Sequence, residues 1–225
     1  MTLTPLDWIG FGGYVLVFLA YSWLVERSPW AKFTLSRLMT KTRRAWFEEC
    51  AKREIRIPDV QIMMVQQNGA AYFGSASLLG IGAGFTVLTA AQSLTESSLL
   101  GGGQGLALKA LFLMLIYALA FFQFSWAFRL FNYSAIALGA IEQISSPKAL
   151  TQAQRAGAFN VVAGQHFNQA IRLFLFAIPL IFWFVSLWAM LAATFILTLI
   201  MLRRQFFTVA QLEGFTLAWQ IDEKE

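Results

Sequence analysis

Three groups of polar side chains stand beside long apolar segments of the sequence. They are Ser125, Arg129 and Asn132; Gln165, Asn168 and Arg172; and Asp59, Gln61 and Asn68. Within the first two groups, spacings of three, four or seven residues place all three side chains on one face of an α-helix. Polar and ionisable groups are costly near lipid, so residues in such places are candidates for a function.

These groups are suited to binding an anion. If the three segments are neighbouring helices, their polar faces could meet in one pocket that holds Arg129 and Arg172, with Asp59 as the nearby carboxylate. A guanidinium group binds phosphate or carboxylate through a fork of hydrogen bonds, so an excess of guanidinium over carboxylate favours an anionic ligand. That anion could be a permeating ion, a small metabolite or a lipid headgroup. The candidate site is completed by Asn132, Asn168, Gln61 and His166.

Simpler roles for the same residues stay open. Arg129 and Arg172 could extend their charged ends to the membrane interface without binding a ligand. The Asn and Gln side chains could hold helices together through interhelical hydrogen bonds, which contribute about 0.6 kcal/mol each. His166 is more readily interpreted as a structural histidine than as a proton carrier.

Composition decides the class of protein. Of the 225 residues, 58% are hydrophobic and 13% are charged, and they include 22 Phe and 8 Trp. The charged share is about half that of an ordinary globular domain, which is typical of an integral membrane protein. One Cys and one His can form neither an intrachain disulfide nor a His/Cys zinc site. We therefore expect no enzyme activity, no metal and no cofactor.

Hydrophobic segments predict an all-α transmembrane bundle of about five spans. The expected spans are residues 6–25, 70–91, 106–128, 166–184 and 187–203, close to the length that crosses ~30 Å of hydrocarbon. Polar residues before position 70 and after position 128 indicate that the helices extend into the cytoplasm. A basic amphipathic helix is expected over 29–56 on the inner leaflet, ended by Ile57 and Pro58 because a residue before proline disfavours helix.

The last apolar region, residues 171–202, has two interpretations. It could be one tilted span, which gives four spans in all, or a hairpin of two helices that turns near Val185 and Ser186. With the hairpin, 16 of the 17 Lys and Arg residues lie inside and only Lys109 lies outside. With a single span the division is 13 to 4. Because basic residues favour the cytoplasmic side, the charges favour the hairpin.

Small residues recur every four positions in the second apolar segment. They are Ala76, Gly80 and Gly84. Such a stripe lets another helix approach closely, so it predicts tight helix packing either within one chain or between copies in an oligomer.

Four short motifs resemble those of one family. They are R-x-x-D-x-Q at 56–61, W-x-x-R-x-x-N-Y at 126–133, H-F-N-x-x-x-R at 166–172 and R-R-x-F at 203–206. Together they resemble the domain-of-unknown-function 599 family of bacterial and plant membrane proteins, over nearly the whole chain. The resemblance implies an integral membrane protein with several helices, and it supplies no activity, substrate or cofactor.

The sequence therefore predicts a single membrane domain over residues 1–225, multi-pass in the cell inner membrane and homo-oligomeric. The leading hypothesis is a channel or transporter with an anion-attracting cytoplasmic vestibule. The alternative is a lipid-binding or scaffold protein that transports nothing. The bilayer and its anionic lipids are the expected partners, and nucleic acid is not expected despite a pI of ≈ 9.6, because the charge lies beside a membrane span.

Overall fold

The structure is a computed structural model that describes residues 3–97, 103–142, 146 and 148–222, with side chains described except at 94–97 and 208–222. Over these residues it contains only helices, which confirms the all-α prediction. They are α1 (Pro5–Glu26), the 3₁₀ helix η1 (Pro29–Phe33), α2 (Leu35–Cys50), α3 (Ile57–Ser97), α4 (Gln104–Gly139), α5 (Ala149–Phe182) and α6 (Leu187–Asp222). Four of them, α1, α3, α4 and α6, are long and apolar enough to cross a membrane.

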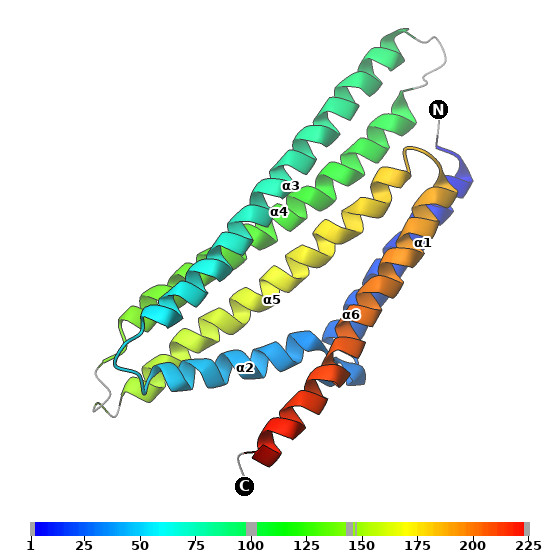
Figure 1. Cartoon of the computed structure of the whole chain (residues 1–225). Coiled ribbons are helices and arrows are strands. Elements are labelled where there is room, and N and C mark those ends of the chain that lie inside the picture. Colours follow the sequence, from blue (N-terminus) through cyan, green and yellow to red (C-terminus); the bar gives the residue numbers. More distant parts are fainter. Residues whose placement is uncertain (1–2, 98–102, 143–145, 147, 223–225) are drawn as a thin grey trace.

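The long helices run alongside one another with alternating direction (Figure 1). α4 packs between α3 and α5, while α1 and α6 lie together beside α5, and α2 crosses obliquely at one end. We call the end that holds α2 and Arg203 the basic end, and the end that holds the α5–α6 connection the turn end. This arrangement gathers the start of α2, the end of α1 and the middle of α5 in one region.

The last apolar region forms a helical hairpin. α5 ends at Phe182, a turn follows over Trp183–Ser186, and α6 begins at Leu187. The Ser186 hydroxyl accepts a hydrogen bond from the Ala189 N–H (3.0 Å), which satisfies an unpaired donor at the start of α6. α5 differs from the other long helices because its first half is polar and only its later part, residues 171–182, is strongly apolar.

The basic segment is divided, in contrast to the single helix expected over 29–56. Ser28 accepts a hydrogen bond from the Trp30 N–H (3.2 Å) and starts η1, whereas Thr34 has an extended backbone (φ −87°, ψ 147°) and separates η1 from α2. α2 ends at Cys50, and Pro58 lies in the first turn of α3 instead of ending the preceding helix. Proline is tolerated there because the first turn needs no backbone N–H from it.

Buried positions in the neighbouring helices α3, α4 and α5 repeat every seven residues, a pattern that was not predicted from the sequence. In α5 the series is Ala149, Ala156, Ala163, Ala170 and Ala177; in α4 it is Ala110, Tyr117, Phe124, Phe131 and Leu138; in α3 it is Met63, Ala70, Ser77, Gly84 and Ala91. A seven-residue period keeps one seam of a helix facing its neighbour, as in a left-handed coiled coil. Small side chains in the α3 and α5 seams let both helices approach α4 closely.

The glycine stripe of α3 lies against α4. A Cβ on Gly80 would lie 2.7 Å from the ring of Tyr117, and a Cβ on Gly84 would lie 2.4 Å from Cγ of Met114. Gly82, between them, has nothing within 4 Å of an added Cβ. The close approach at Gly80 and Gly84 therefore takes place within one chain.

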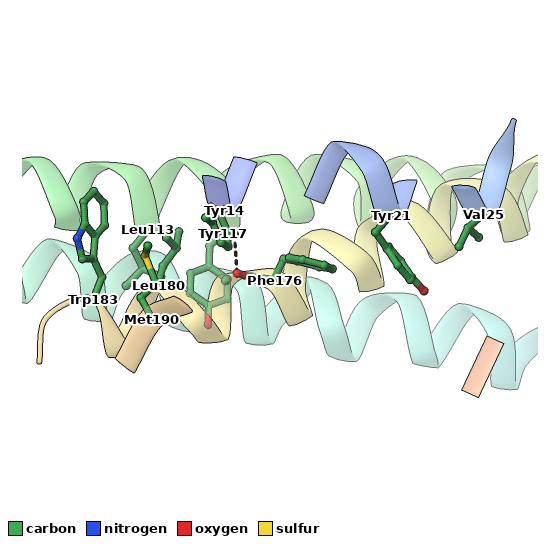
Figure 2. Close-up of a cluster of buried hydrophobic side chains, with 10 residues drawn as sticks. Tyr14, Tyr21, Val25, Leu113, Tyr117, Phe176, Leu180, Trp183 and Met190 are labelled. Carbon is green, nitrogen blue, oxygen red and sulfur yellow. Dashed lines mark hydrogen bonds between the residues drawn. The ribbon is translucent and has the colours of Figure 1, made fainter. Parts of the chain in front are cut away.

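The core between α1, α4, α5 and α6 is rich in aromatic side chains (Figure 2). Tyr14 is buried there, and its hydroxyl donates a hydrogen bond to the Phe176 carbonyl (2.6 Å). That carbonyl lies three residues before Pro179, which has no N–H and disturbs the hydrogen bonds of the preceding turn of α5. Tyr14 thus ties α1 to α5 within the turn that precedes Pro179.

The Tyr14→Phe variant tests this contact. We expect it to lower the free energy of unfolding by about 1 kcal/mol, because the hydroxyl is lost while the buried Phe176 carbonyl stays. Thermal unfolding in detergent measures the change. Tyr72→Phe is the matched control, since Tyr72 is 70% exposed on α3. Equal unfolding midpoints for the two variants would show that the buried bond contributes nothing.

Candidate functional site

The two arginines expected to share a pocket lie in different places. Arg129 is exposed on α4, with its guanidinium over the rings of Trp126 (5.8 Å) and Tyr133 (5.5 Å). Arg172 is buried on α5 and forms an ion pair with Glu26 at the end of α1. The single pocket predicted from the sequence is therefore not formed. The spacing placed each arginine correctly on its own helix face, but it could not say which neighbour that face meets.

Asp59 does not orient either of these arginines. It is fully buried at the start of α3, where its Oδ1 accepts hydrogen bonds from Trp46 Nε1 and Arg53 Nη1, both at 2.7 Å. The carboxylate thus ties the end of α2 and the following loop to α3. Gln61 is exposed nearby on α3.

His166 and Asn132 also lie outside the crevice described below. The His166 Nδ1 is 2.7 Å from the amide oxygen of Gln123, and its ring meets Trp126 edge-on with centroids 6.4 Å apart. This hydrogen-bonded position between α4 and α5 fits the structural interpretation of His166. Asn132 is half-buried on α4.

One of the three polar groups described above, Gln165, Asn168 and Arg172, lines a polar crevice at the basic end. It consists of two adjoining cavities of about 180 and 240 Å³ between the end of α1, the start of α2, α5 and α6. The residues that line both cavities are Val25, Ser36, Thr40, Gln165, Asn168 and Arg172. Asn168 Nδ2 donates to the Ser36 hydroxyl (2.9 Å), and Gln169 Nε2 donates to Glu26 (3.1 Å). A single water needs only ~15 Å³, so each cavity has room for a larger polar group.

Arg43 of α2 also lines the crevice and was not predicted as a candidate from the sequence. Its Nη1 donates to the backbone carbonyl (3.1 Å) and to the side-chain oxygen (2.8 Å) of Asn160, and its guanidinium lies 5.7 Å from the ring centroid of Phe131. Asn160 in turn donates to Gln66 Oε1 (2.8 Å), so these polar contacts link α2, α5 and α3. A Cβ on Gly164 would lie 2.7 Å from Arg43 Cζ, so a larger residue there would displace the guanidinium.

The charge of Arg43 has no carboxylate partner among the described residues. The ion pairs there are Lys52–Glu49, Arg53–Asp59 and Arg172–Glu26. Arg43 is half-buried, and burial lowers its pKa, although a guanidinium stays protonated at any physiological pH. A desolvated charge without a counter-charge costs free energy, so this position favours an added anion.

The lining of the crevice is cationic as a whole. Arg172 lines both cavities, Arg43 lines the smaller, and Arg27 and Arg37 line the larger. Glu26 is the one carboxylate in the two linings, and it is already paired with Arg172. The crevice therefore combines excess positive charge with neutral hydrogen-bonding groups.

Arg43 was overlooked because the basic segment was interpreted as an amphipathic helix on the surface of the inner leaflet. A usable signal was present in α5, where Gly157 and Gly164 are seven residues apart. A Cβ on Gly157 would lie 3.0 Å from Phe47, so both glycines face α2. Two glycines on one helix face indicate a helix docked closely against it, and such docking turns one face of α2 inward.

Cys50, at the end of α2, is fully buried beside this contact. Burial, with the Asp59 carboxylate nearby, raises the pKa of its thiol to about 12. Thiolate is the reactive form, so at pH 8 we expect alkylation to be about 10³-fold or more slower than for an ordinary exposed cysteine and to speed up with rising pH. Maleimide labelling measures this, with Thr42→Cys as the exposed control on the same helix. Equal rates for the two thiols would show that this end of α2 is open.

One comparison identifies the family. The model for the family described as "Protein of unknown function, DUF599" matches residues 9–210. The chain belongs to the DUF599 family. No curated protein and no solved structure matches it. The DUF599 region contains every residue that lines the crevice, and the family description assigns no function, so a functional hypothesis must come from the crevice itself.

Proposed function

We propose that this DUF599 protein is a membrane protein that binds a phosphate-bearing anion in the crevice at its basic end. The observation that carries the proposal is Arg43, a half-buried guanidinium with no carboxylate partner in the described chain, facing a cavity of about 180 Å³. A bound anion would supply the missing counter-charge. It would also meet Arg172 and the hydroxyl of Ser36 in the same cavity.

The chemistry of the lining favours a phosphate group over a small spherical ion. Guanidinium, hydroxyl and carboxamide donors approach the cavity from α2 and α5, and a tetrahedral oxyanion offers acceptors in several directions. Arg43 still has donors beyond the two bonds that its Nη1 makes to Asn160. These donors can form charge-assisted hydrogen bonds, which are roughly twice as strong as neutral ones.

The basic end, in this proposal, faces the cytoplasm of a cell in whose inner membrane the protein resides, and the apolar part of α5 crosses the bilayer as a fifth span. The distribution of Lys and Arg supports this orientation, because among the described residues Lys109 is the one Lys or Arg near the turn end. η1 directly precedes the part of α2 that lines the crevice, and its exposed Trp30 and Phe33 suit the membrane interface. A phospholipid headgroup and a free phosphate are both within reach of such a crevice.

Binding without transport is better supported than the channel or transporter hypothesis. The vestibule of that hypothesis required Arg129 and Arg172 together, and Arg129 lies outside the crevice. The expected homo-oligomer and the expected absence of enzyme activity stay predictions.

The test compares three forms of the purified full chain: wild type, Arg43→Gln and Arg44→Gln. Arg44 is exposed on the same helix and does not line the crevice, so it controls for net charge. One arm measures inorganic phosphate by equilibrium dialysis, and the other measures phosphatidylglycerol retained in native mass spectrometry. In whichever arm the wild type binds the ligand, we expect at least tenfold weaker binding by Arg43→Gln. Binding by Arg44→Gln should be unchanged.

Two results would overturn the proposal. One is equal binding by Arg43→Gln and Arg44→Gln. The other is no binding of either ligand to the wild type. Liposome flux of phosphate that depends on Arg43 would instead favour the transporter hypothesis for the same crevice.

A further inference from the structure

Arg129 forms a second, separate cationic feature on the outer surface of α4. Its guanidinium lies over the indole of Trp126 and the ring of Tyr133, and its Nε donates to the Tyr133 hydroxyl (2.6 Å). These three residues are spaced i, i+3 and i+7 and are all exposed. We call them the Arg129 cluster.

The guanidinium of Arg129 is held in place, while its two terminal nitrogens remain available as hydrogen-bond donors. Two aromatic faces and one hydrogen bond fix its plane, while no hydrogen bond joins its two terminal nitrogens to the described part of the chain. No described carboxylate pairs with it either. The free edge of the fork is the edge that binds a phosphate with two parallel hydrogen bonds, and fixing it in advance reduces the entropy lost on binding.

The position of the cluster along α4 matches a membrane interface. At the turn end, Lys109 of the same helix donates to the Trp183 carbonyl (2.8 Å). Arg129 is 20 residues further along α4, which is about 30 Å at 1.5 Å per residue and equals the usual thickness of the hydrocarbon core. Trp and Tyr are the aromatic residues enriched at that depth, with the indole or phenol at the level of the headgroups.

We propose that the Arg129 cluster binds the phosphate of an anionic phospholipid in the leaflet at the basic end. Charge complementarity carries this choice of occupant, because the cluster offers a cation with two free donors. Phe122, which lies two turns before Arg129 on the hydrocarbon side of the cluster, is exposed and apolar and suits acyl chains instead of a soluble ligand. The cluster lies on α4, away from the crevice that α1, α2, α5 and α6 line, so this lipid site is independent of the function proposed above.

The test measures lipid selectivity next to the cluster. Ser125 is exposed one turn before Arg129, so Ser125→Cys places a fluorophore there, and buried Cys50 is replaced by Ser in all variants. The protein is reconstituted in phosphatidylcholine vesicles that contain small equal fractions of spin-labelled phosphatidylglycerol or spin-labelled phosphatidylcholine. We expect the phosphatidylglycerol to quench at least threefold more strongly per mole, and Arg129→Gln to make the two lipids equal.

The matched control is Ser75→Cys on α3. Ser75 is exposed and lies at the depth of Ser125, because its neighbour Gly74 packs against Phe124. There the two lipids should quench equally. Equal quenching at Ser125, or a phosphatidylglycerol preference that persists in Arg129→Gln, would overturn the proposal. Arg129→Lys, which keeps the charge but loses the fork, should retain less than half of the preference.

Discussion

The Arg43→Gln variant is expected to lose the thermal stabilisation that a phosphate-bearing ligand gives the wild-type protein. A ligand at 100 times its Kd stabilises the folded state by about 2.7 kcal/mol, which raises the unfolding midpoint by about 5–10 °C for a chain of this size. Without Arg43 the cavity keeps Arg172, whose charge is already neutralised by Glu26. The ligand-dependent shift should then fall below about 2 °C. Thermal unfolding with and without ligand measures it.

The thermal stability of the ligand-free protein gives a second prediction, in which Arg172 matters more than Arg43. Removing one partner of an ion pair is usually strongly destabilising because the other charge is left buried and alone. Arg43 has no such partner in the described chain and loses only its hydrogen bonds to Asn160, so its replacement by Gln should lower the ligand-free midpoint less than the loss of an ion-pair partner does. Arg172→Gln removes the charge partner of the half-buried Glu26 and the buried member of this ion pair, so it should lower the midpoint more. If Arg43→Gln lowered the ligand-free midpoint as much as Arg172→Gln does, Arg43 would be a structural residue and not a ligand-binding one.

Replacing Gly84 with leucine is expected to cause the largest loss of stability. The added Cβ alone would lie 2.4 Å from Cγ of Met114, and the rest of the side chain would have to displace α4. Overpacking of this kind costs about 1–3 kcal/mol or more, against a gain of about 0.8 kcal/mol from replacing a helical glycine. The net loss of up to about 2 kcal/mol should lower the unfolding midpoint by up to about 4–9 °C, followed by circular dichroism in detergent.

Gly82→Leu is the control on the same helix. An added Cβ at Gly82 meets nothing within 4 Å, so only the gain in helix propensity applies and stability should stay equal or rise. The opposite signs of the two variants separate a packing effect from a general effect of glycine replacement. Equal effects at Gly82 and Gly84 would contradict the α3–α4 contact.

The all-helical membrane fold was predictable because long apolar runs in a chain with few charges have few other solutions. Polar positions within one helix were also predictable, since spacing alone decides which of them share a face. The relative rotation of the helices was not predictable from the sequence, and this rotation separates Arg129 from Arg172. That rotation depends on seams of small residues such as Ala156 and Ala163, whose seven-residue period is weak beside a strongly apolar background.

The residues of the crevice were likewise only partly predictable from the sequence. Asn168 and Arg172 were predicted as candidates, but Arg43 came from a segment whose charges suggested only a membrane-surface helix. Docking of α2 on Gly157 and Gly164 turns one of its arginines inward while Arg44, the next residue, stays exposed. A sequence pattern shows which positions of a helix are polar. It does not show which side of a short basic helix such as α2 is buried, because that depends on the surface of α5 against which the helix packs.

The most direct test of the central claim is to locate a heavy oxyanion in crystals of the wild-type protein. Tungstate is tetrahedral and doubly charged like phosphate, and its anomalous signal marks its position. We predict a peak within the crevice, bounded by Arg43, Arg172 and Ser36, that disappears in Arg43→Gln crystals. Peaks only at exposed basic residues such as Arg203 and Arg204, with none beside Arg43, would contradict the account.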